Sequence, residues 1–387
     1  MIQMSGDTFK VGPIRPPSEA NSLLLQVTEN CSWNKCKFCM LYKGHAFRTR
    51  PVDEIKADID VMAGYRDMIL AHEHNGVLDE EALNRDFHAL PSFNAKMNYQ
   101  MVFTWLTQGG REAIFLQDAN TIVLRPEWLV DIVSHIKKNF PELNRITSYG
   151  RADALARISL EDMKRIREAG LDRIHSGFES GSDNVLKLID KGVTQEQEIL
   201  GGQKVKAAGM ELSIYFMPGV GGKEYSQENA TETAQVINAI DPDFVRLRTF
   251  VLRIGSLMDD LRKEGKYREC TDMEKLLEIR ELVANIDAHR VKGRLTSDHI
   301  INLLPRVEGR MDRDLPGILE YIDGFLQLPK EEQKIFQLAR RMGSSLDYKD
   351  ITRLRSDKLE ELRKTVGSVP DGKKWEELLH TYMDRYI

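Results

Sequence analysis

Short apolar runs alternate with amphipathic stretches along the chain as far as residue 255. The run at residues 23–28 is mostly apolar and is broken only by Gln26, which is close to the pattern of a strand in a parallel sheet that is covered on both faces. Further segments of strand length follow it along the chain. Together these segments predict six strands, at residues 23–28, 113–116, 145–149, 172–177, 210–217 and 243–251. Alternation of such strands with helices predicts a parallel sheet, and right-handed connections allow that sheet to curl into an open barrel with the helices outside.

Residues typical of helix ends mark several of the predicted helices. The first helix is expected over residues 52–71, where apolar side chains recur at helical spacing. Pro126 suits the first position of another helix, and Ser159 is a suitable N-cap for the helix that follows the third strand. Thr194 and Gln197 form a capping box that opens a further helix. These signals support six strand–helix units.

Residues 73–110 form a long connection between the first helix and the second strand. Two helical patterns, at 79–90 and 94–108, occupy it, whereas a strand–helix–strand unit needs only a short connection. We interpret the segment as a helical insertion. His72 and His74 lie at its start and suggest a metal or acid–base role, but a solvated helix end is favoured because no third ligand lies at a suitable spacing.

The pattern changes after residue 255, where helical periodicity with proline breaks replaces the alternation. We therefore divide the chain into an irregular lead-in at 1–22, a barrel domain at 23–255 and a helical accessory domain at 256–387. The predicted fold class is α/β, with six strand–helix units and an α-helical C-terminal extension.

Three further elements are expected in the accessory domain. A helix is predicted over residues 271–289, and residues 294–297 have the pattern of a short extra strand. The apolar segment 300–304 is expected to be helical, with Ser297 or Asp298 as its N-cap. The extra strand would lie beside the sixth one, so its end would open at the same side of the sheet.

Composition limits the classes of function. The chain of 387 residues is 41% hydrophobic, which supports a sizeable core, and its net charge of −5 is small beside 55 basic and 60 acidic side chains. The lack of a global basic field argues against nucleic acid as a partner. No apolar run has the length of a membrane span, and residues 1–22 lack the pattern of a secretion signal. We therefore expect a cytoplasmic protein without a membrane partner.

Three of the four cysteines, Cys31, Cys36 and Cys39, follow the first predicted strand, separated by four and then two residues. A packed core does not need cysteines this close, whereas converging thiolates suit a soft metal or an iron–sulfur cluster. A zinc site would usually have a fourth ligand, and Cys270 has no second cysteine or histidine at a suitable spacing. A cluster with one open iron is therefore favoured over zinc and over thiols that bind no metal.

The cysteine loop, Phe38 just before its last cysteine and the strand–helix alternation together resemble the radical S-adenosylmethionine (radical SAM) enzymes. The family usually has three and then two residues between its cysteines. The resemblance implies a partial (β/α)6 TIM-type barrel and one [4Fe-4S] cluster on Cys31, Cys36 and Cys39. It also implies anaerobic chemistry, in which reductive cleavage of S-adenosylmethionine gives a 5′-deoxyadenosyl radical that abstracts hydrogen from a small or medium-sized substrate.

Residues after the predicted strands are expected to bind the cofactor, because ligands of parallel barrels lie at the C-terminal ends of the strands. By the resemblance, Asp118 or Asn120 would receive the amino group of S-adenosylmethionine, although an Asx turn explains both residues without a ligand. Arg151, after the third strand, is a candidate cation for the cofactor's carboxylate. Its alternative is an ion pair with Asp153.

Residues 177–182 are similar to the fourth-strand signature of the branch that includes anaerobic coproporphyrinogen dehydrogenases and methylthiotransferases. By this resemblance, Glu179 would accept hydrogen bonds from the ribose hydroxyls, and Lys191 would face the methionine carboxylate. Capping of a helix end is the alternative for Lys191. Ser213 and Met217, at the end of the fifth strand, would line the adenine pocket.

Polar residues near the ends of the last strands are candidates for substrate binding. Arg246, Arg248 and Arg253 suit a carboxylate or phosphate, and salt bridges at the strand edge are the alternative. His299 is expected at a helix start near the same end of the sheet. An imidazole there would bind substrate or relay a proton as a catalytic residue.

Three interpretations of the function compete. The favoured one is a single-cluster radical SAM enzyme, of the oxidoreductase class, that acts on a small molecule with a low-potential electron donor such as ferredoxin or flavodoxin. Additional clusters are not expected, because Cys270 is the only cysteine left. The alternatives are a non-catalytic, metal-stabilised binding module and an RNA-modifying radical enzyme, which would need a basic face that no dense basic run supplies.

Overall fold

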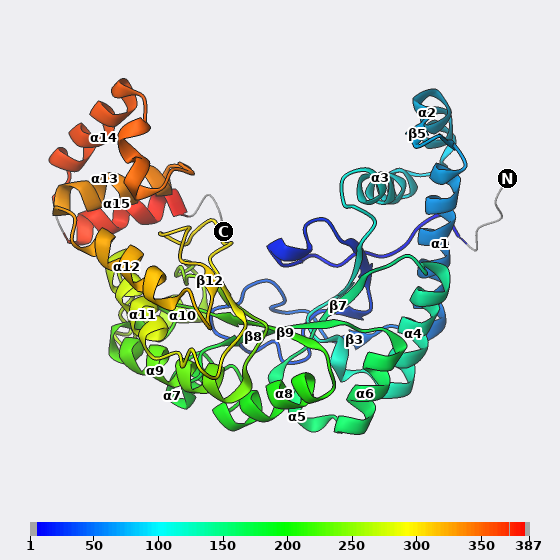
Figure 1. Cartoon of the computed structure of the whole chain (residues 1–387), viewed down its shortest axis with the longest axis horizontal. Coiled ribbons are helices and arrows are strands. Elements are labelled where there is room, and N and C mark those ends of the chain that lie inside the picture. The colour runs from blue at the N-terminus through cyan, green and yellow to red at the C-terminus, as the bar shows by residue number, and fades with distance from the viewer. Residues whose placement is uncertain (1–5, 371, 384–387) are drawn as a thin grey trace. The chain divides into compact units, whose positions relative to one another are not determined.

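The computed structural model describes residues 6–370 and 372–383, and Figure 1 shows its helices and strands. The chain is divided between two compact units. The first comprises Met1–Asn34, Gly44–Ser176 and Lys204–Leu212, and the second comprises Lys35–Lys43, Gly177–Gln203 and Ser213–Ile387. Residues 1–5 of the predicted lead-in, together with 371 and 384–387 of the predicted accessory domain, lie outside the described residues.

One eight-stranded sheet runs in the order β1-β6-β7-β8-β9-β10-β11-β12. Its strands are β1 (Leu23–Gln26), β6 (Ala113–Gln117), β7 (Arg145–Tyr149), β8 (Arg173–Glu179), β9 (Glu211–Phe216), β10 (Phe244–Leu247), β11 (Arg294–Thr296) and β12 (Gly309–Arg310). The six strands predicted from the apolar runs and the extra strand at 294–297 are all present. The predicted α/β class with a mainly parallel sheet is confirmed.

Strand pairing fixes where the strand ends lie. In the first unit, β1 pairs parallel with β6, β6 with β7, and β7 with β8. In the second unit, β9, β10 and β11 are parallel, and β12 pairs antiparallel with β11. Every residue of β6 is buried, as expected for a strand covered on both faces. Within each unit, the carboxyl ends of neighbouring parallel strands therefore lie at one edge of the sheet, where ligands of such sheets bind.

The helices of the first unit begin and end close to the predicted positions. They are α1 (Val52–Leu70), α2 (Glu80–Ala89), α3 (Phe93–Thr107), α4 (Pro126–Asn139), α5 (Ala152–Arg157) and α6 (Leu160–Ala169). Helix α4 packs against both α1 and α6. Pro126 occupies its first turn, and the Ser159 hydroxyl accepts a hydrogen bond from the backbone nitrogen of Asp162 at 3.0 Å. Both predicted N-terminal signals are confirmed.

The predicted insertion contains a small hairpin and the two expected helices. The hairpin is formed by β4 (Glu73–His74) and β5 (Val77–Leu78), and α2 and α3 follow it. His72 contacts Asp86 on α2, with 2.8 Å between Nε2 and Oδ2. This histidine therefore ties the hairpin to α2, whereas His74 lies in β4.

The lead-in is held by a buried acid in the first unit. Glu19, in a 3-10 helix (Pro17–Glu19), accepts a hydrogen bond from the Ser22 hydroxyl at 2.6 Å, and its carboxylate lies 2.9 Å from Nε2 of His175. Burial works against ionisation of Glu19, but the contacts with His175 and Ser22 lower its pKa to about 2. The ion pair fixes the lead-in to the middle of β8.

The helices of the second unit form its C-terminal part. They are α7 (Asp183–Leu188), α9 (Gly222–Ile240), α10 (Leu257–Lys263), α11 (Asp272–Ala284), α12 (Leu315–Leu326), α13 (Lys330–Arg341), α14 (Ser356–Ser368) and α15 (Lys373–Met383). Helix α8 (Gln195–Ala207) begins in the second unit and ends in the first. Helix α11 packs against α9 and α12, and α13 packs against α14 and α15 around a buried cluster that includes Leu338, Trp375 and Leu379.

Two predicted helices differ in the structure. The helix expected over 271–289 ends at Ala284, where the side-chain nitrogen of Asn285 donates to the carbonyl oxygen of Glu281 at 2.8 Å and closes the last turn. The helix expected at 300–304 is absent, so the N-cap role of Ser297 and Asp298 is wrong.

Polar side chains explain the missing helix. The amide of Asn302 bonds to Ser297 and to the backbone oxygen of Leu247, at 3.0 and 3.1 Å. The bond to Ser297 is local and the bond to Leu247 is not, and together they hold the segment in a non-helical conformation.

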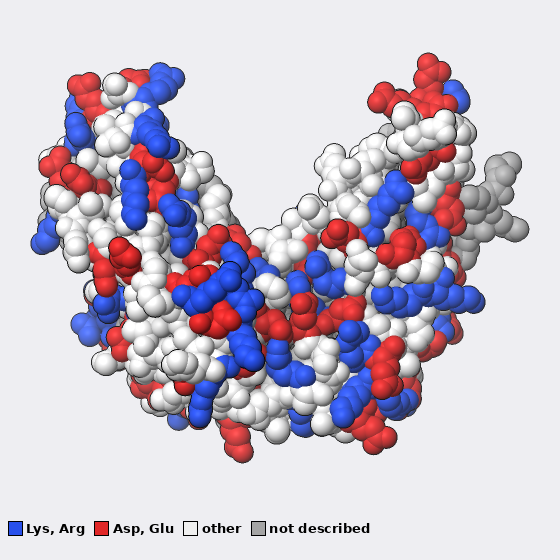
Figure 2. Space-filling view, viewed as in Figure 1, with Lys and Arg blue, Asp and Glu red and all other residues white. Residues whose placement is uncertain are grey.

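Acidic and basic side chains are interleaved on the face shown in Figure 2. No area of one sign dominates this face, which agrees with the small net charge of −5. Within residues 6–370 and 372–383, no helix combines the length and the apolar character needed to cross a membrane.

Candidate functional site

The cysteine loop, residues 30–47, begins after β2 (Thr28–Glu29) and ends at β3 (Arg48–Thr49). These two strands pair antiparallel, and Arg48 donates two hydrogen bonds to the carboxylate of Glu29, at 3.0 and 2.7 Å. The bonds from Arg48 hold the pKa of Glu29 below its ordinary value. The two ends of the loop are therefore close together, beyond the carboxyl end of β1.

Two asparagines shape the ends of this loop. Asn30 and Asn34 have positive φ angles of 65° and 51°, a conformation that asparagine adopts more readily than most residues. Their side-chain amides donate to the backbone oxygens of Ala46 and His45, at 2.8 and 2.9 Å. Sequence analysis missed both residues, although asparagines beside clustered cysteines are a usable signal for such turns.

Cys36 and Cys39 lie in one turn of the second unit. The backbone nitrogen of Cys39 donates to the carbonyl oxygen of Cys36 at 3.2 Å. Lys37 donates from its backbone nitrogen to the carbonyl oxygen of Ile189 at 2.8 Å, and from Nζ to that of Leu188 at 2.9 Å. The turn is therefore held against the end of α7.

The four cysteines all lie among the described residues, and none forms a disulfide bond. Cys36 is buried, whereas Cys31 and Cys39 are partly exposed. Cys31 belongs to the first unit and the other two to the second. In the described part of the chain, no three His, Cys, Asp or Glu side chains are arranged to hold a metal ion. Support for a soft-metal site therefore comes from the chemistry of three thiols that are close in the sequence, and not from their arrangement in space.

Asn120 connects two segments of the first unit. Its side-chain nitrogen donates to the Ser32 hydroxyl, and its side-chain oxygen accepts from the backbone nitrogen of Arg151, both at 3.0 Å. Arg151 donates to Asp153 at 3.0 Å, and its guanidinium lies 5.5 Å from the centre of the Trp33 ring. Because Ser32 and Trp33 belong to the cysteine loop, both predicted cofactor residues contact that loop.

Asp118 is buried directly after β6. Its carboxylate accepts a hydrogen bond from Nε2 of Gln26 at 3.3 Å. A Cβ atom added to Gly12 would lie 3.0 Å from the same carboxylate. The lead-in therefore covers Asp118 closely, and its acid lies beside the carboxyl end of β1.

Glu179 and Lys191, predicted to bind different parts of a cofactor, form an ion pair with each other. The distance from Nζ of Lys191 to Oε1 of Glu179 is 2.9 Å, and both residues are buried. Glu179 is the last residue of β8 and has a positive φ of 69°, which is uncommon for a residue other than glycine. Nζ of Lys191 lies 6.0 Å from the centre of the Phe38 ring, so the pair is close to the cysteine turn.

A buried acid, Glu198, lies near the Glu179–Lys191 pair and was not predicted from the sequence. Glu198, on α8, is fully buried, and neither carboxylate oxygen has a hydrogen-bond partner among the described residues. Burial raises the pKa of Glu198 well above its ordinary value; Lys191 opposes the rise, while Glu179 and Asp183 add to it. Burial therefore favours the neutral form of the Glu198 carboxyl group. A glutamate in a helix rich in charged residues suggests a solvated position, so the sequence held no signal for its burial.

The residues predicted to line an adenine pocket take two different places. Met217 and Phe38 pack against a buried cluster in the second unit, and the backbone nitrogen of Met217 donates to the carbonyl oxygen of Glu179 at 2.8 Å. Ser213 is fully buried, and its hydroxyl accepts a hydrogen bond from Nε of Arg246 at 2.9 Å. Met217 therefore lies near the Glu179 backbone, whereas Ser213 fixes an arginine.

The residues predicted to bind substrate also lie in different surroundings. Asp298 accepts hydrogen bonds from Arg246 and Arg248, at 2.5 and 2.6 Å, whereas Arg253 is exposed. His299 follows Asp298 in a loop and not at a helix start, because the helix expected there does not form. His299 therefore follows, in the sequence, the acid that binds two of the three arginines.

No protein-family model matches this chain. The 4′-phospho-dehydrooxetanocin synthase of Priestia megaterium is 26% identical over 214 residues, which are 51% of this chain and 23% of that protein. The tRNA uridine(34) acetyltransferase of Methanocaldococcus infernus is 23% identical over 119 residues, which are 30% of this chain and 22% of that protein. The chain thus spans about a quarter of the length of these curated relatives.

Solved structures of radical SAM enzymes are also similar. The cobalamin-dependent S-adenosylmethionine radical enzyme OxsB, with aqua-cobalamin bound, has a TM-score of 0.40 and 14% identity, over 94% of this chain and 58% of that one. The radical SAM methyltransferase TsrM from Kitasatospora setae, with cobalamin and a [4Fe-4S] cluster bound, has a TM-score of 0.41 and 13% identity, over 89% and 61%. Radical SAM enzymes are thus among the proteins that this chain resembles, as the cysteine loop predicted. At these scores the similarity assigns no role to any residue.

Proposed function

We propose that this chain is a radical SAM enzyme that holds one [4Fe-4S] cluster on Cys31, Cys36 and Cys39 and acts with S-adenosylmethionine on a small molecule. The observation that carries the proposal is the cysteine loop, which has three thiols outside any disulfide and is fixed beyond the carboxyl end of β1. Ligands of parallel sheets bind at that end.

Cys270 does not belong to the proposed site. It is buried, and burial together with Glu278 raises the pKa of its thiol to about 12. Thiolates, and not thiols, bind metals, so Cys270 is a poor ligand. A site with three cysteines leaves one iron without a protein ligand, and that position suits a small molecule such as S-adenosylmethionine.

Cys31, Cys36 and Cys39 would hold the cluster, which would supply one electron for the reductive cleavage of S-adenosylmethionine to methionine and the 5′-deoxyadenosyl radical that takes hydrogen from the substrate. The chain's own residues bind and orient. We assign Glu179 to the ribose hydroxyls and Lys191 to the methionine carboxylate. Their ion pair holds both side chains in place before the cofactor arrives, and the cofactor would then take over one partner of each. Phe38 would cover one side of this pair, since its ring centre lies 6.0 Å from Nζ of Lys191, and Met217 packs against the same buried cluster as Phe38.

The polar residues of the first unit have two proposed roles. We assign Asp118 to the amino group of S-adenosylmethionine, because it is a buried acid beside the carboxyl end of β1. Asn120 and Arg151 act on the cofactor through the cysteine loop, since their contacts are with Ser32 and Trp33. An electron donor of low potential, such as ferredoxin or flavodoxin, completes the proposal. Oxidoreductase chemistry and a cytoplasmic location stay predictions from the sequence.

An RNA-modifying radical enzyme is the second candidate. One observation favours it, namely that a relative is a tRNA uridine(34) acetyltransferase. The interleaved charges in Figure 2 offer no extended basic face on the side shown, and phosphate backbones are bound by such faces. We therefore place the small-molecule substrate first.

Anaerobic reconstitution with iron and sulfide tests the proposal. The expected result is brown protein with about four irons per chain, which releases 5′-deoxyadenosine when S-adenosylmethionine and dithionite are added. Cys31→Ala, Cys36→Ala and Cys39→Ala should each lose iron, and Cys270→Ala is the matched control that should keep it. Colourless protein that holds zinc would reject the enzyme and support a metal-stabilised binding module.

A further inference from the structure

Two arginines share one carboxylate in the second unit. Asp298 follows β11, and it accepts hydrogen bonds from Arg246 on β10 and from Arg248 just after β10, at 2.5 and 2.6 Å. Burial works against ionisation of Asp298, but Arg248 and then Arg246 hold its pKa below the ordinary value. Two guanidinium groups against one ionised carboxylate leave an excess positive charge at the carboxyl ends of these strands. Only 6% of the Arg246 side chain and 14% of the Arg248 side chain are exposed, so water screens this charge poorly.

Neighbouring side chains fix both arginines in place. Nε of Arg246 donates to the Ser213 hydroxyl at 2.9 Å, and the guanidinium of Arg248 lies 4.9 Å from the centre of the Tyr215 ring. Ser213 and Tyr215 both belong to β9, which pairs with β10. The positive charge is therefore held by the sheet and not by flexible loops alone.

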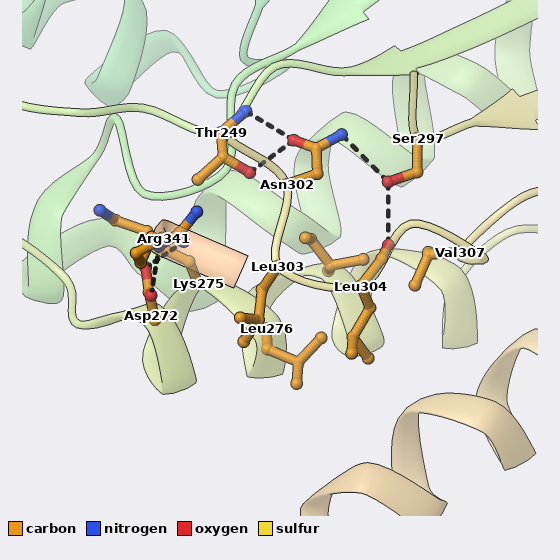
Figure 3. A pocket seen from close by; sticks show the side chains of 11 residues that line it. Thr249, Asp272, Lys275, Leu276, Ser297, Asn302, Leu303, Leu304, Val307 and Arg341 are labelled. Atoms are coloured by element: carbon orange, nitrogen blue, oxygen red, sulfur yellow. Dashed lines mark hydrogen bonds and ion pairs between the residues drawn. The ribbon is translucent and has the colours of Figure 1, made fainter. Parts of the chain in front are cut away.

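Asn302 sets the spacing between the two loops that carry the charged groups. Its side-chain oxygen accepts from the backbone nitrogen and the hydroxyl of Thr249, at 3.2 and 2.8 Å. Its side-chain nitrogen donates to the Leu247 carbonyl at 3.1 Å and to the Ser297 hydroxyl at 3.0 Å. Figure 3 shows Asn302 between Thr249 and Ser297. Since Leu247 and Thr249 flank Arg248, one amide fixes its backbone on both sides.

Two polar atoms in this cluster are buried without a partner. Nη2 of Arg248 and Nδ1 of His299 have no hydrogen-bond partner among residues 6–370 and 372–383. Buried polar groups are rarely left unpaired, because the loss of hydration is costly. Burial lowers the pKa of His299 to about 4; Arg248 and Arg341 add to the decrease and Asp298 opposes it. The imidazole is therefore neutral at pH 7 and has one N–H to donate.

We propose that Arg248 and His299 bind an oxyanion group of the substrate, either a carboxylate or a phosphate. The anion would accept one hydrogen bond from Nη2 of Arg248 and one from Nδ1 of His299, and it would balance the excess positive charge. That the anion belongs to the substrate rests on the proposed function, whereas the anion site rests on the contacts above. His299 is then a substrate-binding residue.

Direct titration of the full chain tests the anion site without the cluster and without S-adenosylmethionine. Inorganic phosphate and acetate are titrated separately by calorimetry, at an ionic strength held constant with sodium chloride. One of the two anions should bind, and Arg248→Lys and His299→Phe should each weaken that binding about tenfold, the loss of one charge-assisted hydrogen bond. Arg253→Lys is the matched control, because Arg253 is an exposed arginine shortly after the same strand.

The outcomes separate the possibilities. Tighter binding of phosphate indicates a phosphorylated substrate, and tighter binding of acetate indicates a carboxylic acid. The proposal is overturned if neither anion binds, or if Arg253→Lys weakens binding as much as Arg248→Lys. Circular dichroism checks that each variant folds, and His299→Phe decides the question if Arg248→Lys does not fold. Anion binding by a chain that never cleaves S-adenosylmethionine would reject only the proposed function, whereas cleavage without anion binding would reject only this inference.

Discussion

Gly177 and Glu179 lie so close together that a side chain at position 177 would displace the carboxylate of Glu179. A Cβ atom at residue 177 would lie 2.2 Å from Oε1 of Glu179 and 3.2 Å from Nζ of Lys191. The carboxylate of Glu179 therefore folds back over the glycine, in agreement with its positive φ of 69°. The glycine of this segment is required by the ion pair beside it rather than by its own backbone angles.

Gly177→Ala should displace the Glu179 carboxylate while leaving the cysteine loop intact. Binding of S-adenosylmethionine is expected to weaken by about tenfold or more, because a hydrogen bond to a charged group is lost. Equilibrium dialysis with the reconstituted protein measures the affinity, and iron analysis should show no change. The control is Gly317→Ala on α12, where an added Cβ meets nothing within 4 Å. An unaltered affinity in Gly177→Ala would remove Glu179 from the cofactor site.

Glu198→Gln should make the stability of the protein less sensitive to high pH. Burial holds the pKa of Glu198 well above its ordinary value, whereas in the unfolded chain it is about 4.3. The folded protein is therefore fully stabilised by the protonated acid at a pH below the pKa of Glu198 in the unfolded chain. This stabilisation is lost as the pH rises through the pKa of Glu198 in the folded protein. The variant avoids this loss.

Relative to the unchanged protein, Glu198→Gln should gain stability between pH 5 and pH 8, by up to about 1.4 kcal/mol for each pH unit. Urea unfolding at the two pH values measures the difference in free energy of unfolding. Glu196→Gln, at an exposed position of the same helix, is the control and should show no such gain. Equal stability changes at both pH values would mean that Glu198 is ionised in the folded protein.

The main sheet was predictable because burial on both faces demands apolar residues at consecutive positions, whatever their partners. Strand β6 shows this well, since all of its residues from Ala113 to Gln117 are buried. The cysteine loop was predictable for another reason. Thiols at close spacing have few structural uses, so residue chemistry alone identified Cys31, Cys36 and Cys39 as candidates.

Hydrogen bonds between single polar side chains and residues far away in the sequence could not be predicted. Asn302 prevents the helix expected at 300–304 by bonding to Leu247, which is 55 positions away. Glu198 is buried only because of how α8 lies in the fold, and its sequence neighbours suggest a solvated face. The pairing of Glu179 with Lys191 likewise depends on an unusual backbone angle that local sequence does not determine.

Asn120→Ala should loosen the start of the cysteine loop. The change removes buried hydrogen bonds to Ser32 and to the backbone of Arg151, at a cost of about 1–3 kcal/mol in the free energy of unfolding. Alkylation of Cys31, followed by mass spectrometry in the iron-free protein, should become faster. The control is Asn94→Ala at an exposed position of α3, which should change neither quantity. Unchanged alkylation would show that Asn120 does not position the loop.

Arg341→Met should be among the most destabilising substitutions in the second unit. Arg341 donates two hydrogen bonds to Asp272, at 3.0 and 2.7 Å, and each side chain is only 2% exposed (Figure 3). Removal of the arginine leaves a buried charge uncompensated, which costs about 3–5 kcal/mol. Urea unfolding at pH 7 measures this cost.

The pH dependence of the same variant carries a defined sign. Burial opposes ionisation of Asp272, but Arg341 holds its pKa below the ordinary value. The ion pair therefore stabilises the folded protein at a pH above the pKa of Asp272 in the unfolded chain, and this stabilisation is lost as the pH falls. Arg341→Met should therefore lose less stability on acidification than the unchanged protein. Combining it with Asp272→Asn should recover part of the stability, and a double variant no better than the single one would show that the two residues are not coupled.

The division of the chain has a practical consequence for fragment design. The backbone passes from one unit to the other after residues 34, 43, 176, 203 and 212, so neither unit is a continuous piece of chain. A fragment that starts at residue 213 would keep Arg248 and His299 but would lack Cys36, Cys39 and Glu179. Since such a fragment would contain only part of the second unit, we expect point substitutions in the full polypeptide to be the better way to separate the proposed cofactor residues from the proposed substrate residues.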